Sequence, residues 1–172
     1  MTLVLGGNIH YYAGGHTSKG FVSLLDSSLQ DIRTVYLIRG EHAFGASEFM
    51  REFGRSAAAE GEEGWVIHSP FLRGGIDGIV MPESGMAVVA ESGLRGESLR
   101  CPDADIRTID WPDVYDKRRL AGREGELARL REAMEQSFSA AYARFAEALR
   151  VHDDWERIYI TNLDKRAAAE LA

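Results

Sequence analysis

Eight consecutive residues, Gly40 to Ser47, have types and a spacing that can bind phosphate. They read Gly40, four residues, Gly45, Ala46 and Ser47, against the phosphate-loop pattern G-x-x-x-x-G-K-[ST]. Glycines let backbone amides curl around a β-phosphate, and the following helix points unpaired N–H groups and its positive dipole end at the anion. A serine at the helix start can cap it or hold Mg²⁺. The frame predicts a site for ATP with Mg²⁺ or for another phosphorylated anion.

The loop departs from this pattern at the lysine that normally reaches the β- and γ-phosphates. Ala46 stands there and cannot supply the charge, Glu41 would repel a triphosphate, and Phe44 is bulky for a cradle. We therefore expect little or no hydrolysis. Either the loop binds an anion through main-chain donors, or it is a strand–turn–helix connection that has kept its shape without a ligand. The candidate ligand-binding residues are Gly40, Glu41, His42, Ala43, Phe44, Gly45, Ala46, Ser47 and Lys19.

Lys19 belongs to this set because it lies in a glycine-rich turn, Gly14 to Gly20, ahead of the loop. If that turn folds over the loop, its ammonium replaces the missing cation; the alternative is a solvated lysine. For Mg²⁺ we expect Ser47 and Glu91 as ligands, because Glu91 follows an apolar strand where a metal-binding carboxylate is expected. Asp77 is a further candidate carboxylate, and two histidines are candidates as well: His42 within the loop and His16 in the glycine-rich turn.

The segments around the loop predict an α/β fold. Continuous apolar runs are typical of strands that are covered on both faces, and apolar residues at steps of three and four indicate helices. We expect a three-layer domain, 1–172, with a mainly parallel sheet. The predicted strands are 34–38, 65–68, 76–81 and 86–90, the predicted helices are 21–29 and 48–60, and 91–112 is a predicted loop.

The last third predicts a long helical element, 117–150, with an apolar row from Leu127 to Leu149. We interpret this row as a core face packed on the chain's own sheet or on a neighbouring helix; a coiled-coil seam is the alternative. Val151 to Asp154 is expected to interrupt the helix. A last strand over 155–160 and a helix from about Asn162 are expected to follow.

Several stretches resemble an uncharacterised family of bacterial P-loop ATPases. They are H-Y-Y-A-G-G-H-T-S-K-G-F-V-S-L-L-D-S-S-L from His10, the strand and loop that follow, I-D-G-I-V-M-P-E from Ile76 and W-E-R-I-Y-I-T-N-L-D from Trp155. Typical members look like two tandem copies of such a unit, and this chain is similar to one copy. The resemblance implies a P-loop NTPase fold and places Gly40, Gly45 and Ser47 on the phosphate loop.

The chain departs from this family at two charged positions. Ala46 replaces the lysine, and Ala90 stands where relatives end the strand with an aspartate. Glu91 is next to it, but a shift of one residue reverses the direction of a side chain on a strand. The resemblance therefore implies a fold and a chemical class, while the loss of both charges argues against catalysis.

Composition limits the partners. The chain has 172 residues, with 20 Lys and Arg against 27 Asp and Glu and a net charge of −7, which argues against nucleic-acid binding. No apolar run is long enough to span a membrane, and the start of the chain does not form a secretory signal. The single Cys101 fits a reducing, cytoplasmic compartment.

Two functions follow from the sequence. The first is a degenerate P-loop domain that binds a nucleotide or phosphorylated anion at residues 40–47. The second is a non-catalytic scaffold or self-association domain that uses the helix 117–150, either as a homo-oligomer or with a related second P-loop unit. Replacing Ala46 with lysine is expected to create nucleotide affinity if the loop keeps its geometry.

Overall fold

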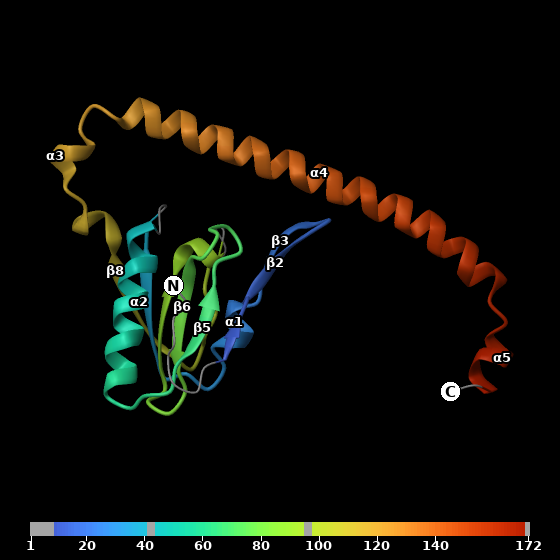
Figure 1. Cartoon of the computed structure of the whole chain (residues 1–172), viewed down its shortest axis with the longest axis horizontal. Coiled ribbons are helices and arrows are strands. Elements are labelled where there is room, and N and C mark those ends of the chain that lie inside the picture. Colours follow the sequence, from blue (N-terminus) through green and yellow to red (C-terminus); the bar gives the residue numbers. More distant parts are fainter. Residues whose placement is uncertain (1–8, 41–43, 95–97, 171–172) are drawn as a thin grey trace. The chain divides into compact units, whose positions relative to one another are not determined.

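The computed structural model describes residues 9–40, 44–94 and 98–170, with the side chains of Phe44, Asp113 and Arg119 left out. The chain divides into two compact units. The first contains Met1–Gly15 and Phe21–Leu120, and the second contains His16–Gly20 and Ala121–Ala172. Figure 1 shows the elements of both.

The first unit is built on a six-stranded sheet with the order β1-β5-β6-β7-β4-β8. Strand β6 runs antiparallel to both of its neighbours, whereas β1 with β5, β4 with β7, and β4 with β8 are parallel pairs. The predicted α/β class with a mostly parallel sheet is therefore confirmed. The strands are β1 His10–Tyr11, β4 Thr34–Arg39, β5 Trp65–His68, β6 Ile76–Met81, β7 Met86–Ala90 and β8 Asp105–Asp110.

Strands β6 and β7 form the most buried part of the sheet. Every residue of β6 is buried, as expected for a mainly apolar strand covered on both faces. A tight turn reverses the chain after β6, where the Gly85 N–H donates to the Pro82 carbonyl at 3.1 Å and Gly85 has a φ of +65°. This short connection requires β6 and β7 to be antiparallel, since parallel strands need a long crossover.

Two hydrophobic clusters cover the two faces of the sheet. The cluster beneath helix α2, Phe44–Ala59, includes Ala46, Met50 and Trp111. The opposite cluster includes Leu25 from the short helix α1, Leu25–Ser28, together with Leu29 and Leu94. Among the described residues, only the first face is thus covered by a long helix.

The predicted helix over 48–60 and the predicted strands over 34–38, 65–68, 76–81 and 86–90 are confirmed. The helix expected over 21–29 is confirmed only in its second part, as α1, Leu25–Ser28. Its first part was wrong, because it belongs to β3, Gly20–Ser23, which pairs with β2, Gly14–Thr17. The expected loop over 91–112 was also wrong, because it contains β8. This edge strand is mostly exposed and contains the charged residues Asp105, Arg107 and Asp110, so it lacks an apolar run. Short helices η1 Glu91–Leu94, η2 Trp111–Val114 and α3 Lys117–Leu120 flank it.

The second unit consists mainly of helix α4, Glu124–Asn162, followed by α5, Lys165–Glu170. The predicted long C-terminal helix is confirmed, but the break at 151–154 and the strand at 155–160 were wrong. Trp155, Tyr159 and Ile160 have side chains typical of strands, yet they lie within one unbroken helix. The interpretation of the apolar row as a core face was wrong too, since no residue of α4 is buried.

The tip of the β2–β3 hairpin belongs to this second unit. The His16 ring stacks on Phe138 with centroids 5.7 Å apart, and His16 Nδ1 lies 3.0 Å from the Tyr142 hydroxyl. The hairpin therefore covers Phe138 and Tyr142, which are half-buried. Among the described residues, no helix is long and apolar enough to cross a membrane.

Candidate functional site

The candidate loop lies at the carboxyl edge of the sheet, where open α/β sheets usually bind ligands. Strand β4 lies between β7 and β8, and all three run in the same direction. Their carboxyl ends therefore bring together the start of the loop after Arg39, Glu91 after β7 and Trp111 after β8. Helix α2 begins at Phe44 on the same edge.

The Gly40 amide is directed at a carboxylate. Gly40 has a φ of +146°, a conformation that favours glycine, and its N–H donates to Glu91 Oε2 at 3.0 Å. Glu91 reaches this amide because β4 and β7 are adjacent parallel strands. One main-chain donor of the loop thus already binds an anionic group from the chain itself. The candidate residues Glu41, His42 and Ala43 and the side chain of Phe44 lie outside the described part of the chain.

Trp111 and Pro112 pack against both glycines of the loop. A Cβ on Gly40 would lie 3.2 Å from Pro112 Cδ, and a Cβ on Gly45 would lie 3.3 Å from the Trp111 indole. The indole also contacts Phe49 of α2, with ring centroids 5.7 Å apart. Close packing against Trp111 and Pro112 therefore explains why positions 40 and 45 are glycine. This explanation does not require a bound phosphate.

Ala46 and Ser47 face the interior. Ala46 is fully buried in the cluster beneath α2. Ser47 is 2% exposed, and its Oγ accepts a hydrogen bond of 2.8 Å from the Ile76 N–H, which joins α2 to the first residue of β6. The serine that we expected to bind Mg²⁺ thus holds the helix to the sheet.

Lys19, the expected substitute cation, belongs to the second unit, whereas the loop belongs to the first. It is exposed in the hairpin turn, where its own N–H donates to Thr17 Oγ1 at 3.1 Å. Arg39, the cation next to Gly40 in sequence, forms an ion pair of 2.8 Å with Asp110 across β4 and β8.

Asp77 is a buried carboxyl at the second residue of β6. The pairing of β5 with β6 shifts between Ile67 and His68, so Asp77 is the extra residue of a bulge. The Ser92 hydroxyl donates to its Oδ1 at 3.4 Å, while Oδ2 has no hydrogen-bond partner among the described residues. Burial raises the pKa of Asp77 from its ordinary 3.8 to about 6, against opposing hydrogen bonds from Ser69 and Ser92. This carboxyl can therefore exchange a proton near neutral pH.

His10 and His68 form a pair that the sequence analysis missed. His10 Nδ1 lies 2.9 Å from His68 Nε2, and the rings stack with centroids 5.1 Å apart. Burial lowers the pKa of His68, and the nearby His10 lowers it further. Each histidine lies in an extended segment of the chain, and this was the signal in the sequence. Parallel pairing of β1 with β5 brings the two segments together.

Among the described residues, three metal-ligating side chains come together on α4. They are His152, Asp153 and Glu156, and all of them are exposed. This group lies in the second unit and does not include Ser47 or Glu91.

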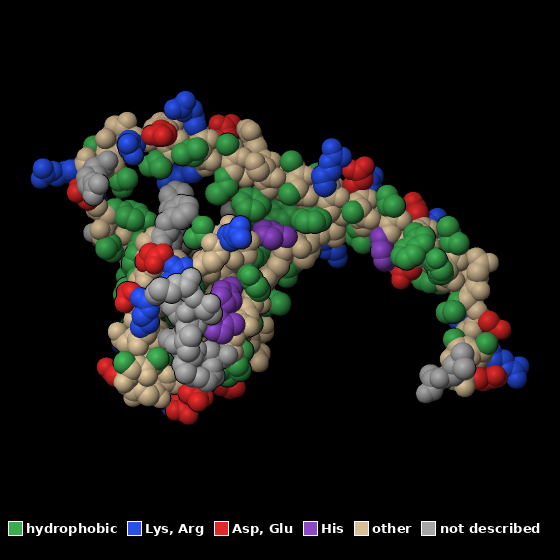
Figure 2. All heavy atoms as spheres, viewed as in Figure 1, with side chains coloured by type: hydrophobic (Ala, Val, Ile, Leu, Met, Phe, Trp, Pro, Cys, Tyr) green, Lys and Arg blue, Asp and Glu red, His purple; other side chains and the backbone are tan. Residues whose placement is uncertain are grey.

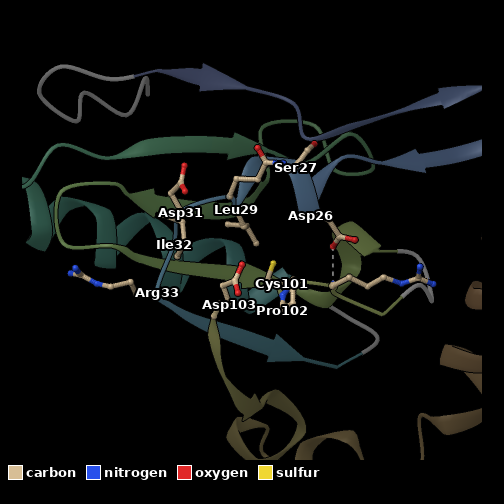
Figure 3. Close-up of a pocket in the computed structure, with 12 residues that line it drawn as sticks. Asp26, Ser27, Leu29, Asp31, Ile32, Arg33, Cys101, Pro102 and Asp103 are labelled. Atoms are coloured by element: carbon tan, nitrogen blue, oxygen red, sulfur yellow. Dashed lines mark hydrogen bonds between the residues drawn. The ribbon is translucent and has the colours of Figure 1, made fainter.

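A separate hollow of about 610 Å³ lies at the amino ends of β4 and β8, the edge opposite to the loop. Figure 3 shows Asp26, Asp31 and Asp103 around it, with Cys101 and Arg33. Asp26 Oδ1 accepts a bond of 2.9 Å from the Arg100 N–H, and burial raises the pKa of the Cys101 thiol. The mixed charges around this hollow do not single out a ligand.

Comparisons with protein-family models, with curated proteins and with solved structures found no match to this chain. The resemblance to P-loop ATPases therefore stays a prediction from the sequence.

Proposed function

We propose that this protein is a non-catalytic association domain whose helix α4 binds another helix. The observation that carries this proposal is the exposure of α4: it has 39 residues and none of them is buried. At 1.5 Å per residue it extends for about 58 Å. A helix in a globular protein normally owes most of its stability to an apolar face packed on neighbours.

An apolar face is present on α4, and apart from Phe138 and Tyr142, which the tip of the β2–β3 hairpin covers, it is exposed. We define the α4 apolar face as a set of apolar residues that recur along one side of the helix with their side chains about half exposed. It consists of Leu130, Met134, Phe145, Leu149, Trp155 and Tyr159, which are between 41% and 61% exposed. Contiguous exposed apolar surface on this scale usually marks an interaction site. Figure 2 shows hydrophobic side chains exposed along much of the visible side of α4.

The chemistry of the first unit supports an absence of hydrolysis. Ala46 provides no charge for a γ-phosphate, Ser47 is engaged with β6, and Glu91 holds the Gly40 amide. Phosphoryl transfer requires positioned cations around the reacting phosphate. An association role uses α4 and does not require this loop.

Sedimentation equilibrium tests the proposal. The full chain should associate between about 1 and about 100 micromolar. Phe145→Lys, in the α4 apolar face, should shift the chain to a monomer, whereas Ala143→Lys, close by in sequence but on the opposite side of the helix, should not. Lysine is a good helix former, so both variants retain helix propensity. Equal association of the two variants would refute a role for this face.

A second candidate function is binding of a phosphorylated anion at residues 40–47. The observation in its favour is the Gly40 N–H, which already donates to the Glu91 carboxylate at the carboxyl edge of the sheet. Glu91→Gln would remove the competing negative charge. Phosphate, ADP or ATP with Mg²⁺ should then raise the melting temperature of the variant more than that of the parent chain. No shift with any of these anions in either protein would exclude this function.

A further inference from the structure

We infer that the partner of α4 is a second copy of this chain, paired antiparallel about a two-fold axis at the level of Ala143. This inference rests on the proposed association function and adds the identity of the partner and its direction. It is carried by three properties of α4: the period of its apolar residues, the positions of two charges and the area of its uncovered face.

The apolar residues repeat in a way that keeps them on one side of a straight helix. Leu127, Phe138, Leu149 and Ile160 are equally spaced along the sequence, with about three helical turns between neighbours. An 11-residue repeat of this kind corresponds to about 3.67 residues per turn, close to the period of about 3.6 in an unstrained α-helix. This row therefore stays nearly aligned along α4, with Phe138 covered by the tip of the β2–β3 hairpin, and a second straight helix can follow the α4 apolar face.

The midpoint of α4 coincides with the centre of this pattern. Helix α4 runs from Glu124 to Asn162, so Ala143 is its central residue. With a two-fold axis at this level, the two helices overlap over their full length. Each face residue then meets the residue equally far on the other side of the centre; Met134 faces His152 of the second copy, because both are equally distant from Ala143.

Two opposite charges lie at the border of the α4 apolar face and specify the direction. Arg131 precedes Ala143 by slightly more than three turns, and Glu156 follows it by nearly the same distance. They are about seven turns apart, so they share one side of the helix but are separated by about 37 Å. They cannot reach each other within one helix. An antiparallel second copy brings each Arg131 to a Glu156 at both ends of the pair.

A parallel pair would keep these charges apart. Arg131 and Glu156 would stay about seven turns from each other along the two helices, so no Arg131–Glu156 pair would form across the interface. His152, on the same face, would face its own copy. The charge pattern therefore favours the antiparallel arrangement.

The area of the face fits a dimer of moderate affinity. The residues of the α4 apolar face are about half exposed, and a large side chain covers about 150–250 Å² when it is buried. Two copies would thus bury about 1,000 Å² from these residues alone. The stems of the flanking side chains add to this value, which approaches the roughly 1,200 Å² of small stable interfaces. We expect a dissociation constant in the micromolar range.

Cysteine cross-linking tests the direction directly. In a Cys101→Ser background, one chain carries Met134→Cys and another carries His152→Cys. Under oxidising conditions, a mixture of the two chains should form a disulfide-linked dimer, while each chain alone should not. Linkage within each separate sample would show a parallel pair and overturn this inference while leaving the association function intact.

A charge reversal tests the same register without new cysteines. Arg131→Glu and Glu156→Arg should each weaken dimerisation by roughly threefold to thirtyfold, and the double variant should restore it. No restoration by the double variant, with dimers still present, would overturn the antiparallel register alone. A parent chain that stays monomeric in sedimentation at all concentrations would refute both the dimer and the proposed function.

Discussion

Replacing Ala46 with lysine restores the residue that the phosphate-loop pattern specifies, but the fold predicts a different effect. Ala46 is fully buried between α2 and the sheet, in the cluster that contains Met50 and Trp111. A lysine there must place a four-carbon stem and an ammonium group inside a packed cluster or push α2 away from the sheet. We therefore expect a loss of stability instead of the gain in nucleotide affinity expected from the sequence.

The magnitude follows from two costs. Overpacking of a close-packed core typically costs about 1–3 kcal/mol. An unpaired ammonium in such a site costs several kcal/mol more, unless the side chain reaches water or loses its proton. Ala46→Lys should thus lower the free energy of unfolding by about 3 kcal/mol or more. For a unit of this size, such a loss lowers the melting temperature by roughly 10 °C or more.

Urea denaturation and thermal melting at neutral pH, with and without ATP and Mg²⁺, measure this effect. Ala59→Lys is the matched control, because it adds the same side chain to the exposed end of α2. The control should retain the stability of the parent chain. An Ala46→Lys protein as stable as the control, with a melting temperature that rises in ATP and Mg²⁺, would show that position 46 points into a working phosphate loop.

Three further predictions concern other described residues. Burial raises the pKa of Asp77 to about 6, so ionisation of this carboxyl destabilises the folded state, and the free energy of unfolding should fall by up to about 3 kcal/mol as the pH rises from about 4 to about 6. In urea denaturation curves, Asp77→Asn should remove this fall. The exposed control Asp103→Asn should leave it unchanged. Trp111→Ala should cost about 3–5 kcal/mol in the same assay, because the indole packs on Gly45 and Phe49; a loss below about 1 kcal/mol would contradict that packing. His16→Ala should increase proteolysis of the β2–β3 hairpin, because it removes the stacking on Phe138; an unchanged cleavage rate would argue against this contact.

The sequence predicted the central strands well because their burial leaves a simple signal. Strands β4, β6 and β7 consist mainly of apolar residues, and β6 is buried at every position. Turn residues such as Pro82 and Gly85 mark where they end. The helix α2 was equally clear, since its apolar residues recur on one side only.

The errors occurred where local pattern and environment disagree. Strand β8 is an edge strand with exposed charges, and only its pairing with β4 makes it a strand. Trp155 to Ile160 has strand-forming side chains, but the preceding helix continues through it. Tertiary context overrides propensity for β8, and helix continuity overrides it in α4.

The candidate loop shows why a motif alone does not establish a site. The frame of Gly40, Gly45 and Ser47 was found from spacing, and the strand–loop–helix arrangement around it is present. The contacts of these residues with Trp111, Ile76 and Glu91 could not be read from the sequence, because all three partners come from distant segments. Such long-range contacts determine whether a glycine serves a ligand or serves packing.

Hydrogen–deuterium exchange along α4, measured at low and high protein concentration, tests the proposed association most directly. If two copies pair antiparallel about Ala143, the amides of α4 should gain protection as the concentration rises, most strongly near the middle and equally towards both ends. Exchange of the α4 amides that is independent of concentration would contradict the proposed association.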